Sequence, residues 1–254
     1  MGVTTDQDEQ AEAPSPGSDS RPFPRRHGRG RIAAAVSVFG ELLITAGLVL
    51  GLFVVYSLWW TNVLADRKAD RQGAKVRDHW ASATPDSGPG ALDTKDGIGF
   101  LHVPAMNNGD VLVEKGTETS VLNDAVAGYY TDPVKATLPM TGRTGNFALA
   151  AHRDGHGAKF HNIDKLKKGD PIVFETKDDW YVYKVFAILP QTSKYNVEVL
   201  TAVPEQAGVK KRGHYITLTT CTPVFTSEYR YIVWGELVRV DRVDSKRTPP
   251  KELS

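Results

Sequence analysis

The hydrophobic positions divide the chain into one long apolar stretch near the N-terminus and a region of short apolar runs that begins near residue 97. Residues 32–60 carry a single charged side chain, Glu41, and the last 19 of them carry none. Those 19 residues span roughly 28 Å as a helix, close to the ~30 Å hydrocarbon core of a bilayer. Aromatic residues lie near one end, as they do at membrane interfaces (Tyr56, Trp59 and Trp60). The pattern predicts a transmembrane helix over 32–60.

Two other interpretations of this stretch are less consistent with its length. A buried core helix rarely continues this far without polar residues, and a cleaved signal peptide has an apolar region of about 7–15 residues. Basic residues lie on both sides of the stretch, so the positive-inside count is nearly tied. We expect a single-pass cell-membrane protein with a cytoplasmic N-terminal tail, because the long C-terminal part has the pattern of a folded domain that works outside.

The remaining segments differ sharply in composition. Residues 1–31 are polar, with Pro, Gly and a cluster of Arg, and predict a disordered cytoplasmic tail. Residues 61–96 begin with charged side chains that can continue the helix as a solvated one, and end in a linker with Pro and Gly. Residues 97–243 are numerous enough for one sizeable core. Residues 244–254 are polar and predict a flexible tail.

The folded domain has a mostly β pattern. Short runs of β-branched and aromatic residues are bounded by turn formers, and only two segments favour short helices. The expected strands cover residues 99–103, 111–114, 146–151, 171–175, 180–189, 214–220 and 229–240, and the expected helices cover 119–126 and 159–166. Many short strands with few helices predict an all-β domain, either a barrel or a sandwich.

Composition excludes several classes of function. Lys and Arg total 31 against 30 Asp and Glu, a formal net charge of +1, whereas nucleic-acid-binding domains usually carry a strong basic excess. A single cysteine excludes an intramolecular disulfide framework and a multi-cysteine zinc site. His152 and His156 have helical ligand spacing, but no Glu follows the first, and Gly155 disfavours a helix. We expect no metal and no cofactor.

The lone cysteine lies in a pattern typical of a reactive thiol. Along residues 215–221, alternation places Cys221 on the more polar face of a strand, at its end, away from Ile216 and Leu218. The following strand begins with Arg230, which a short connection can bring beside Cys221, where a fixed cation favours a thiolate. A third strand, with small side chains on one face, leads to His152. A lone cysteine with a histidine elsewhere is the composition of a cysteine-nucleophile enzyme, although that pairing alone is weak.

These segments together resemble the sortase family. Thr217-Leu218-Thr219-Thr220-Cys221 is similar to the TLxTC signature, and the upstream Ala-His-Arg at 151–153 and the downstream Arg230 match the order of the family's His, Cys and Arg. The resemblance extends over most of residues 97–243, and the membrane segment is similar to that of actinobacterial class E sortases.

The resemblance implies a closed eight-stranded β-barrel and a cysteine transpeptidase. Cys221 would attack the Thr–Gly bond of a C-terminal sorting signal of the LAxTG or LPxTG type and form a thioacyl intermediate. His152 would act as acid and base, and Arg230 would hold the substrate and stabilise the oxyanion. Thr220 would help to position the substrate or the oxyanion. The partners implied are surface proteins with sorting signals and a peptidoglycan amine as acceptor.

A class E preference for LAxTG is linked with a tyrosine in a Gly-His-Tyr segment. Here the segment is Gly128-Tyr129-Tyr130, so Tyr130 matches that tyrosine and Tyr129 replaces the histidine. A peptide hydrolase is a close variant of the same chemistry. The competing class is a membrane-tethered β-barrel that only binds or scaffolds, which would be expected to lack one of Cys, His and Arg. All three are present.

Overall fold

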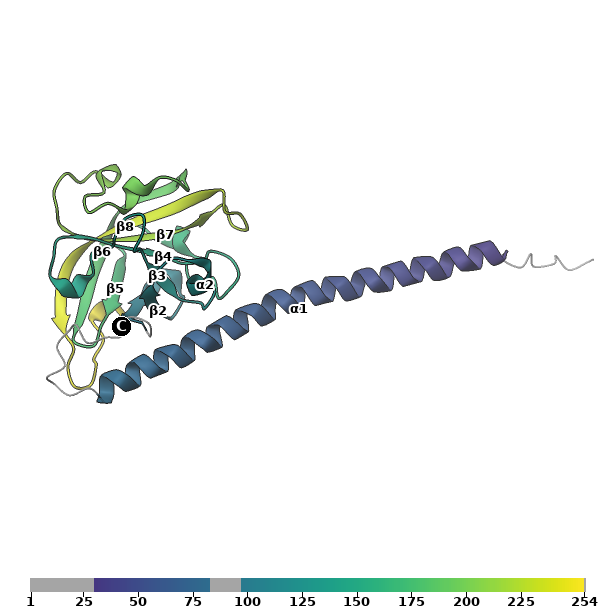
Figure 1. Cartoon of the computed structure of the whole chain (residues 1–254), viewed down its shortest axis with the longest axis horizontal. Helices are drawn as coiled ribbons and strands as arrows, with labels where there is room; N and C mark the ends of the chain where they lie inside the picture. Colours follow the sequence, from purple (N-terminus) through teal and green to yellow (C-terminus); the bar gives the residue numbers. More distant parts are fainter. Residues whose placement is uncertain (1–29, 83–96, 254) are drawn as a thin grey trace, which may run out of the picture. The chain divides into compact units, whose positions relative to one another are not determined.

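The computed structural model describes residues 30–82 and 97–253 (Figure 1). It divides into two compact units after Gly51. The helix α1 (Arg31–Ser82) begins in the first unit and continues into the second, which contains all the strands. Residues 1–29 of the expected disordered tail (1–31) and residues 83–96, most of the expected linker (81–96), lie outside the described residues.

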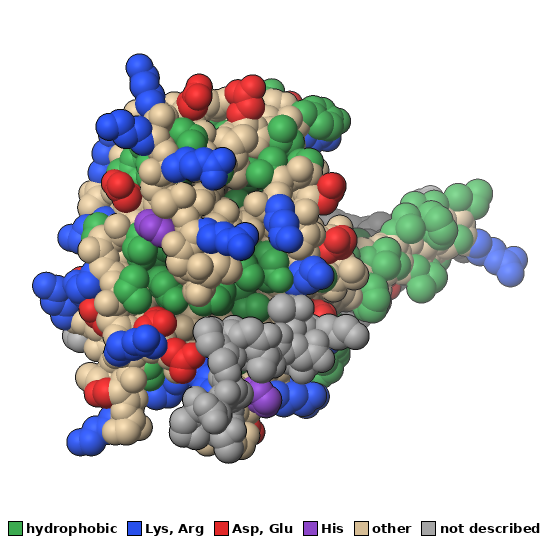
Figure 2. All heavy atoms as spheres, turned by 60° about the vertical axis from the view of Figure 1, so that its left-hand side comes forward, with side chains coloured by type: hydrophobic (Ala, Val, Ile, Leu, Met, Phe, Trp, Pro, Cys, Tyr) green, Lys and Arg blue, Asp and Glu red, His purple; other side chains and the backbone are tan. Residues whose placement is uncertain are grey.

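The N-terminal part of α1 is apolar over its whole circumference. Its large side chains are exposed, and Figure 2 shows hydrophobic groups covering this stretch. In the described part of the chain, α1 is the one helix long and apolar enough to cross a membrane. Since a bilayer is the environment that stabilises such a surface, this helix is a candidate membrane span, and the expected span over residues 32–60 lies within it.

Eight strands form a closed barrel in the order β1-β2-β3-β4-β7-β8-β6-β5. Two pairs, β2 with β3 and β4 with β7, are parallel, and the other pairs are antiparallel. The strands are β1 (Gly99–His102), β2 (Asp110–Lys115), β3 (Ala127–Tyr129), β4 (Gly145–Ala150), β5 (Pro171–Glu175), β6 (Asp179–Ser193), β7 (His214–Thr222) and β8 (Tyr229–Arg242). The prediction of an all-β domain is confirmed, and closure of the sheet distinguishes a barrel from a sandwich.

Alternation along the strands sorts side chains between the barrel interior and its outer surface. On β7, Ile216 and Leu218 belong to the interior core, which also contains Phe147 and Leu149 from β4. A second apolar cluster packs outside the barrel, where Trp234 of β8 is 1% exposed. Cys221 therefore lies on the outward face of β7, as alternation predicts.

Local irregularities explain where the observed elements differ from the expected ones. The strand β3 has only three residues, too few for a period-2 pattern to be recognised. The helix expected over 119–126 is limited to α2 (Thr119–Leu122), because the chain turns at Asn123 and reaches a positive φ of 59° at Ala125. The helix expected over 159–166 is one 3-10 turn, Ile163–Lys165.

Residues 61–82 form a helix as expected, but not a solvated one. One face is buried against the barrel, and Trp80 meets Phe100 edge-on with ring centroids 5.5 Å apart. Residues 244–253, expected to be flexible, also lie on the barrel: Arg247 pairs with the buried Glu175 at 2.7 Å, and Glu252 pairs with Arg239 at 2.8 Å. In both segments, charged side chains alternate with a few apolar residues that pack on the barrel. Hydropathy alone therefore does not show that these segments are bound to it.

Candidate functional site

The ends of β4 and β7 and the beginning of β8 meet at one edge of the barrel. In the parallel β4–β7 pair, Ala150 lies opposite Thr219. Two residues beyond these positions are His152 and Cys221. In the antiparallel β7–β8 pair, Cys221 lies directly opposite Arg230. The structure thus brings together the three residues that the sequence separates by up to 78 positions.

Cys221 is a free, half-buried cysteine, and a buried arginine contacts the backbone at its position. Arg153 is 6% exposed and donates to the hydroxyl of Thr222 at 2.9 Å. Its Nη1 also lies 3.5 Å from the carbonyl oxygen of Cys221, and its Nη2 pairs with Asp164 at 3.1 Å. Because these contacts fix the end of β7, the thiol is carried on rigid backbone.

His152 is half-buried and has neighbours on two sides. Its Nε2 lies 2.8 Å from Oδ1 of Asn123, in the loop after α2. The ring of His156 lies 5.4 Å from it, centroid to centroid, at an interplanar angle of 33°. Burial lowers the pKa of His152, the nearby His156 lowers it further, and Asp154 opposes both.

Asp154 connects the segments that follow the histidine and the cysteine. Its Oδ2 accepts a hydrogen bond of 2.6 Å from the backbone N–H of Phe225, in the loop between β7 and β8. Phe225 has a φ of 66° and is 86% exposed. An apolar side chain is therefore held at the surface, in the short loop between Cys221 and Arg230.

Arg230 has a guanidinium group bound to backbone carbonyls. Its Nη1 donates to Ser227 at 3.2 Å and to Tyr229 at 3.0 Å. Within the described residues no carboxylate forms an ion pair with it. The side chain is half-buried, so a positive charge opposite Cys221 remains available to an anion or a polarised carbonyl.

The two other predicted site residues lie on different faces of the sheet. The Tyr130 hydroxyl lies 3.0 Å from Oγ1 of Thr219, which shares the outward face with Cys221. Burial raises the pKa of Tyr130 above its usual value, although the hydrogen bond to Thr219 and the charge of Arg230 act in the opposite direction. Thr220 is buried on the other face and donates to the carbonyl of Ala151 at 2.7 Å. Its hydroxyl thus connects β7 to the residue before His152.

Comparison with known proteins identifies the family. The model of the sortase domain matches residues 101–238. Sortase SrtE2 of Streptomyces coelicolor is 69% identical to this chain over 258 aligned residues that cover 100% of both proteins. The chain belongs to the sortase family.

Further sortases agree with this assignment. Sortase SrtE1 of Streptomyces coelicolor is 43% identical, over 92% of this chain and 67% of that protein. The crystal structure of sortase E1 from that organism with a tripeptide in the active site superposes with a TM-score of 0.59 and 44% identity, covering 63% of this chain and 98% of the other. Sortase E from Streptomyces avermitilis gives a TM-score of 0.54 at 32% identity, over 63% and 98% of the two chains. The predicted class E resemblance is confirmed, and the chain is a cysteine transpeptidase.

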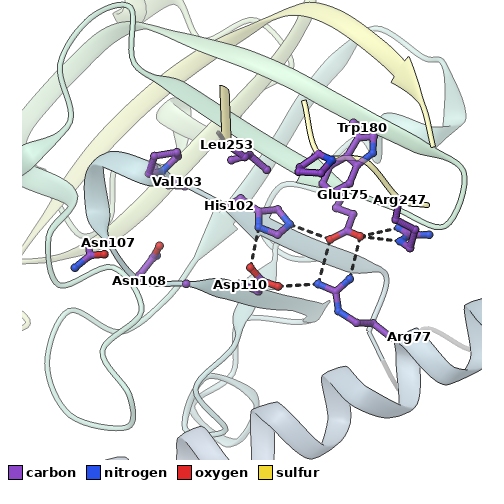
Figure 3. Close-up of a pocket in the computed structure, with 13 residues that line it drawn as sticks. Arg77, His102, Val103, Asn107, Asn108, Asp110, Glu175, Trp180, Arg247 and Leu253 are labelled. Carbon is purple, nitrogen blue, oxygen red and sulfur yellow. Dashed lines mark hydrogen bonds and ion pairs between the residues drawn. The ribbon is translucent and has the colours of Figure 1, made fainter. Parts of the chain in front are cut away.

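A pocket of about 540 Å³ lies elsewhere on this sortase and contains none of Cys221, His152 and Arg230. Figure 3 shows its charged groups: Arg77 of α1 and Arg247 both reach the buried Glu175, and His102 bridges Glu175 and Asp110. These groups neutralise one another, so the cluster joins α1, the barrel and the C-terminal segment.

Two neighbours of the site, Asn123 and Asp154, have contacts that the sequence does not predict. Asn123 lies 29 residues before His152 in a loop without periodicity, so nothing in the sequence connects the two. Asp154 follows His152 by two residues in the sequence, but its bond to Phe225 depends on the fold. No group of three or more His, Cys, Asp or Glu suited to a metal occurs in the described ranges, 30–82 and 97–253.

Proposed function

We propose that this sortase cleaves a C-terminal sorting signal of the LAxTG or LPxTG type between Thr and Gly, with Cys221 as the nucleophile. The observation that carries the proposal is that the chain's single cysteine lies directly opposite Arg230, at the end of β7, and that the neighbouring strand β4 ends two residues before His152. Sortases are cysteine transpeptidases, and this chain has no second thiol.

The first half of the reaction transfers the acyl group to sulfur. The Cys221 thiolate attacks the Thr carbonyl carbon, a C–S bond forms and the C–N bond to Gly breaks. His152, as imidazolium, gives its proton to the departing Gly nitrogen. In the second half, an acceptor amine attacks the thioester, His152 takes the amine proton, and the thiolate is released.

Arg230 is proposed to bind the carbonyl oxygen that becomes negative in each tetrahedral intermediate. Its position opposite Cys221 and the absence of an ion-pair partner in the described residues support this role. The buried hydroxyl of Thr220 is bonded to Ala151, which supports positioning of the strand that carries His152 rather than direct contact with the substrate.

Tyr130 is proposed to contact the second residue of the signal, Ala or Pro. Its hydroxyl lies on the Cys221 face of the barrel through its hydrogen bond to Thr219. Substrates are then surface proteins with a C-terminal signal, and the acceptor is an amine of a peptidoglycan precursor. We further propose that α1 spans the cell membrane with the N-terminal tail inside and the barrel outside.

The decisive experiment uses the full chain in detergent micelles with Leu-Ala-x-Thr-Gly and Leu-Pro-x-Thr-Gly peptides. Mass spectrometry should detect cleavage between Thr and Gly and a thioacyl adduct, both absent from Cys221→Ala. Thr217→Ala, on the same face of β7 and four residues before Cys221, is the control and should keep the adduct. A folded, thiol-reactive wild type that forms no adduct with either peptide would contradict the proposal. That result would instead favour a binding domain that has kept the residues without the activity.

A further inference from the structure

The part of α1 that follows the apolar stretch has a buried face of small residues followed by larger ones. We call this the docking face: Ala65, Ala69, Gly73, Val76 and Trp80. The spacing of three and four residues places them in one row along the helix. A Cβ at Gly73 would lie 3.0 Å from the ring of Phe100. The small residues therefore allow the helix backbone to approach the barrel closely.

The N-terminal half of the docking face contacts the two loops that surround His152. Ala65 and Ala69 pack with Ala125 and Val126, in the loop between α2 and β3. In the same loop, Asp124 forms an ion pair with Lys68 of the helix.

The second loop, which follows β4, is bound by polar groups of the same helix. The side-chain oxygen of Asn62 accepts a hydrogen bond of 3.0 Å from the backbone N–H of Gly157. Asp66 pairs with Lys159 at 2.9 Å. Both loops are thus attached to two successive turns of α1.

Gly157 marks the point where the helix and both loops meet. Its φ is +76°, and a Cβ there would lie 2.6 Å from the Cβ of Ala125 and 2.7 Å from Oδ1 of Asp66. Real Cβ contacts are not this short, so only glycine fits. Ala125 and His156, on the two loops, also have positive φ values, 59° and 46°. The surrounding contacts hold these unfavourable backbone conformations in place.

Each loop supplies one neighbour of His152. Asn123, directly before Asp124, presents Oδ1 to Nε2 at 2.8 Å, and His156, directly before Gly157, lies against the ring. With the Asn123 carboxamide in this orientation its oxygen accepts the hydrogen bond, so Nε2 carries a hydrogen. Nδ1 is then the nitrogen at which His152 gains and loses its proton.

We propose that Asn123 is a positioning residue that fixes the tautomer and orientation of His152, and that the docking face of α1, with Asn62 and Asp66, holds Asn123 and His156 in place. The inference rests on the acid–base role proposed for His152. The membrane anchor's extension then belongs to the working active site. In this arrangement His152 is the base and Asn123 is the third group that orients it, as in other enzymes with a nucleophile and a base.

Besides the thiol of Cys221, charged or titratable groups lie near His152 and its hydrogen-bond partner. They include His156 and Asp154 from the loop after β4, and Asp124, paired with Lys68, beside Asn123. A carboxylate at position 123 would add a negative charge at hydrogen-bond distance, whereas an alanine would remove an acceptor that favours the imidazolium. Variants at this position should therefore move the titration of His152 in opposite directions.

The first test compares Asn123→Ala and Asn123→Asp with wild type, as full chains in micelles. For Asn123→Ala we expect kcat for Leu-Ala-x-Thr-Gly cleavage to fall about 10- to 100-fold with little change in KM, since small errors of position have effects of this size. NMR of labelled histidine, assigned with His152→Ala, should give a lower pKa for His152 in Asn123→Ala and a higher one in Asn123→Asp. Asn123→Asp should retain more activity and shift its pH profile upward.

The second test removes helix contacts while leaving Asn123, His152 and His156 unchanged. Asp66→Asn and Asn62→Ala together should reduce kcat several-fold and broaden the His152 resonance. The matched control is Glu252→Gln, which breaks a comparable ion pair with Arg239 far along the chain and should leave both readouts unchanged.

Two results would overturn the inference. One is wild-type kcat together with an unchanged His152 titration in Asn123→Ala. The other is a uniform loss of activity that follows a lower melting temperature while His152 titrates as in wild type, which would be a structural effect only. Cys221→Ala separates this from the proposed function: if it is inactive while Asn123→Ala is normal, only the positioning role fails. If Cys221→Ala remains active, the proposed reaction fails.

Discussion

The guanidinium group of Arg230 is held in place without forming an ion pair in the described residues, which leaves its charge available to a substrate. Its two hydrogen bonds go to backbone carbonyls in its own turn, so the guanidinium is oriented without being neutralised. Arg153, two strands away, shows the opposite arrangement: it is buried and paired with Asp164. The first arginine suits a substrate, and the second stabilises the fold.

The substitution Arg230→Ala should leave a folded protein with greatly reduced activity. Loss of one donor to a developing oxyanion costs roughly 100- to 1,000-fold in kcat, whereas few native contacts are lost. Peptide cleavage and thermal unfolding of the full chain measure the two effects. Arg242→Ala, whose side chain is 83% exposed at the other end of β8, should match wild type. Wild-type turnover by Arg230→Ala would remove this residue from the mechanism.

Tyr130 should influence substrate choice more than stability. In Tyr130→Phe, the Thr219 hydroxyl keeps its hydrogen bond to Leu149, so the loss of stability should be only about 1 kcal/mol. We expect the ratio of kcat/KM for Leu-Ala-x-Thr-Gly over Leu-Pro-x-Thr-Gly to change several-fold. Tyr195→Phe, an exposed tyrosine, is the control. An unchanged ratio would mean that Tyr130 does not read the second residue of the signal.

At the scale of elements, α1, β1, β5 and the C-terminal segment are joined by one ionic cluster (Figure 3). Glu175 is buried and accepts hydrogen bonds from Arg77 and Arg247, and its Oε2 lies 2.9 Å from Nε2 of His102. Removing Glu175 would leave Arg77, Arg247 and His102 without the carboxylate that they share. The cluster is therefore a point at which pH changes should act on the whole assembly.

The three titrating groups of the cluster define its pH window. Burial lowers the pKa of His102, but its bonds to Asp110 and Glu175 outweigh this and raise it above 6.5. Burial raises the pKa of Glu175, but its bonds to His102, Arg247 and Arg77 outweigh this and hold it below 4.5. The bond to His102 lowers the pKa of Asp110 below 3.8.

The sign of each shift gives the expected stability profile. The histidine's contribution is complete below pH 6.5 and is lost as pH rises through its higher folded-state pKa. Glu175 and Asp110 contribute fully to stability above pH 4.5 and pH 3.8, respectively. These contributions are lost as the pH falls through the lower pKa values that the two groups have in the folded state. Melting temperature against pH should therefore fall above neutrality less steeply in His102→Gln than in wild type. His79→Gln, on the exposed side of α1, should follow wild type. Parallel wild-type and His102→Gln curves would contradict this assignment.

At the scale of the whole molecule, residues 61–82 belong to the catalytic domain. Trp80 is 6% exposed, stacks edge-on with Phe100 and lies under the guanidinium of Arg247, 4.7 Å from its ring centre. Removing this helix would uncover Phe100, Leu112 and Val126 on the barrel. A buried tryptophan alone contributes about 3–5 kcal/mol relative to alanine.

A chain that begins at residue 61 should therefore behave differently from one that begins at residue 83. The shorter chain should melt at least about 6 °C lower, since 3 kcal/mol corresponds to a shift of this order for a domain of this size. It should also cleave the signal peptide more slowly. Differential scanning calorimetry and peptide cleavage test this, with Trp80→Ala in the longer chain as the point-substitution counterpart. Equal melting temperatures would show that the docking face adds nothing to the barrel.

The sequence by itself determined the apolar stretch, the β pattern and the identity of the candidate trio. Each of these depends on local spacing: 19 uncharged residues, a period of two along β7, and a cysteine between a histidine and an arginine in chain order. The parity of alternation was enough to place Cys221 on the outward face and Arg230 beside it, because strand pairing follows directly from a short connection.

Only the tertiary structure decided which loops and helix turns surround the trio. Asn123 reaches His152 across 29 residues, and Asn62 reaches Gly157 across 95. Such contacts leave no periodic trace, because each depends on barrel closure to bring distant segments to one edge. The buried face of residues 61–82 consists of small and aromatic residues at helical spacing. Charged residues between them make the segment look solvent-exposed in the sequence, so the buried face is recognised only from the barrel surface that it covers.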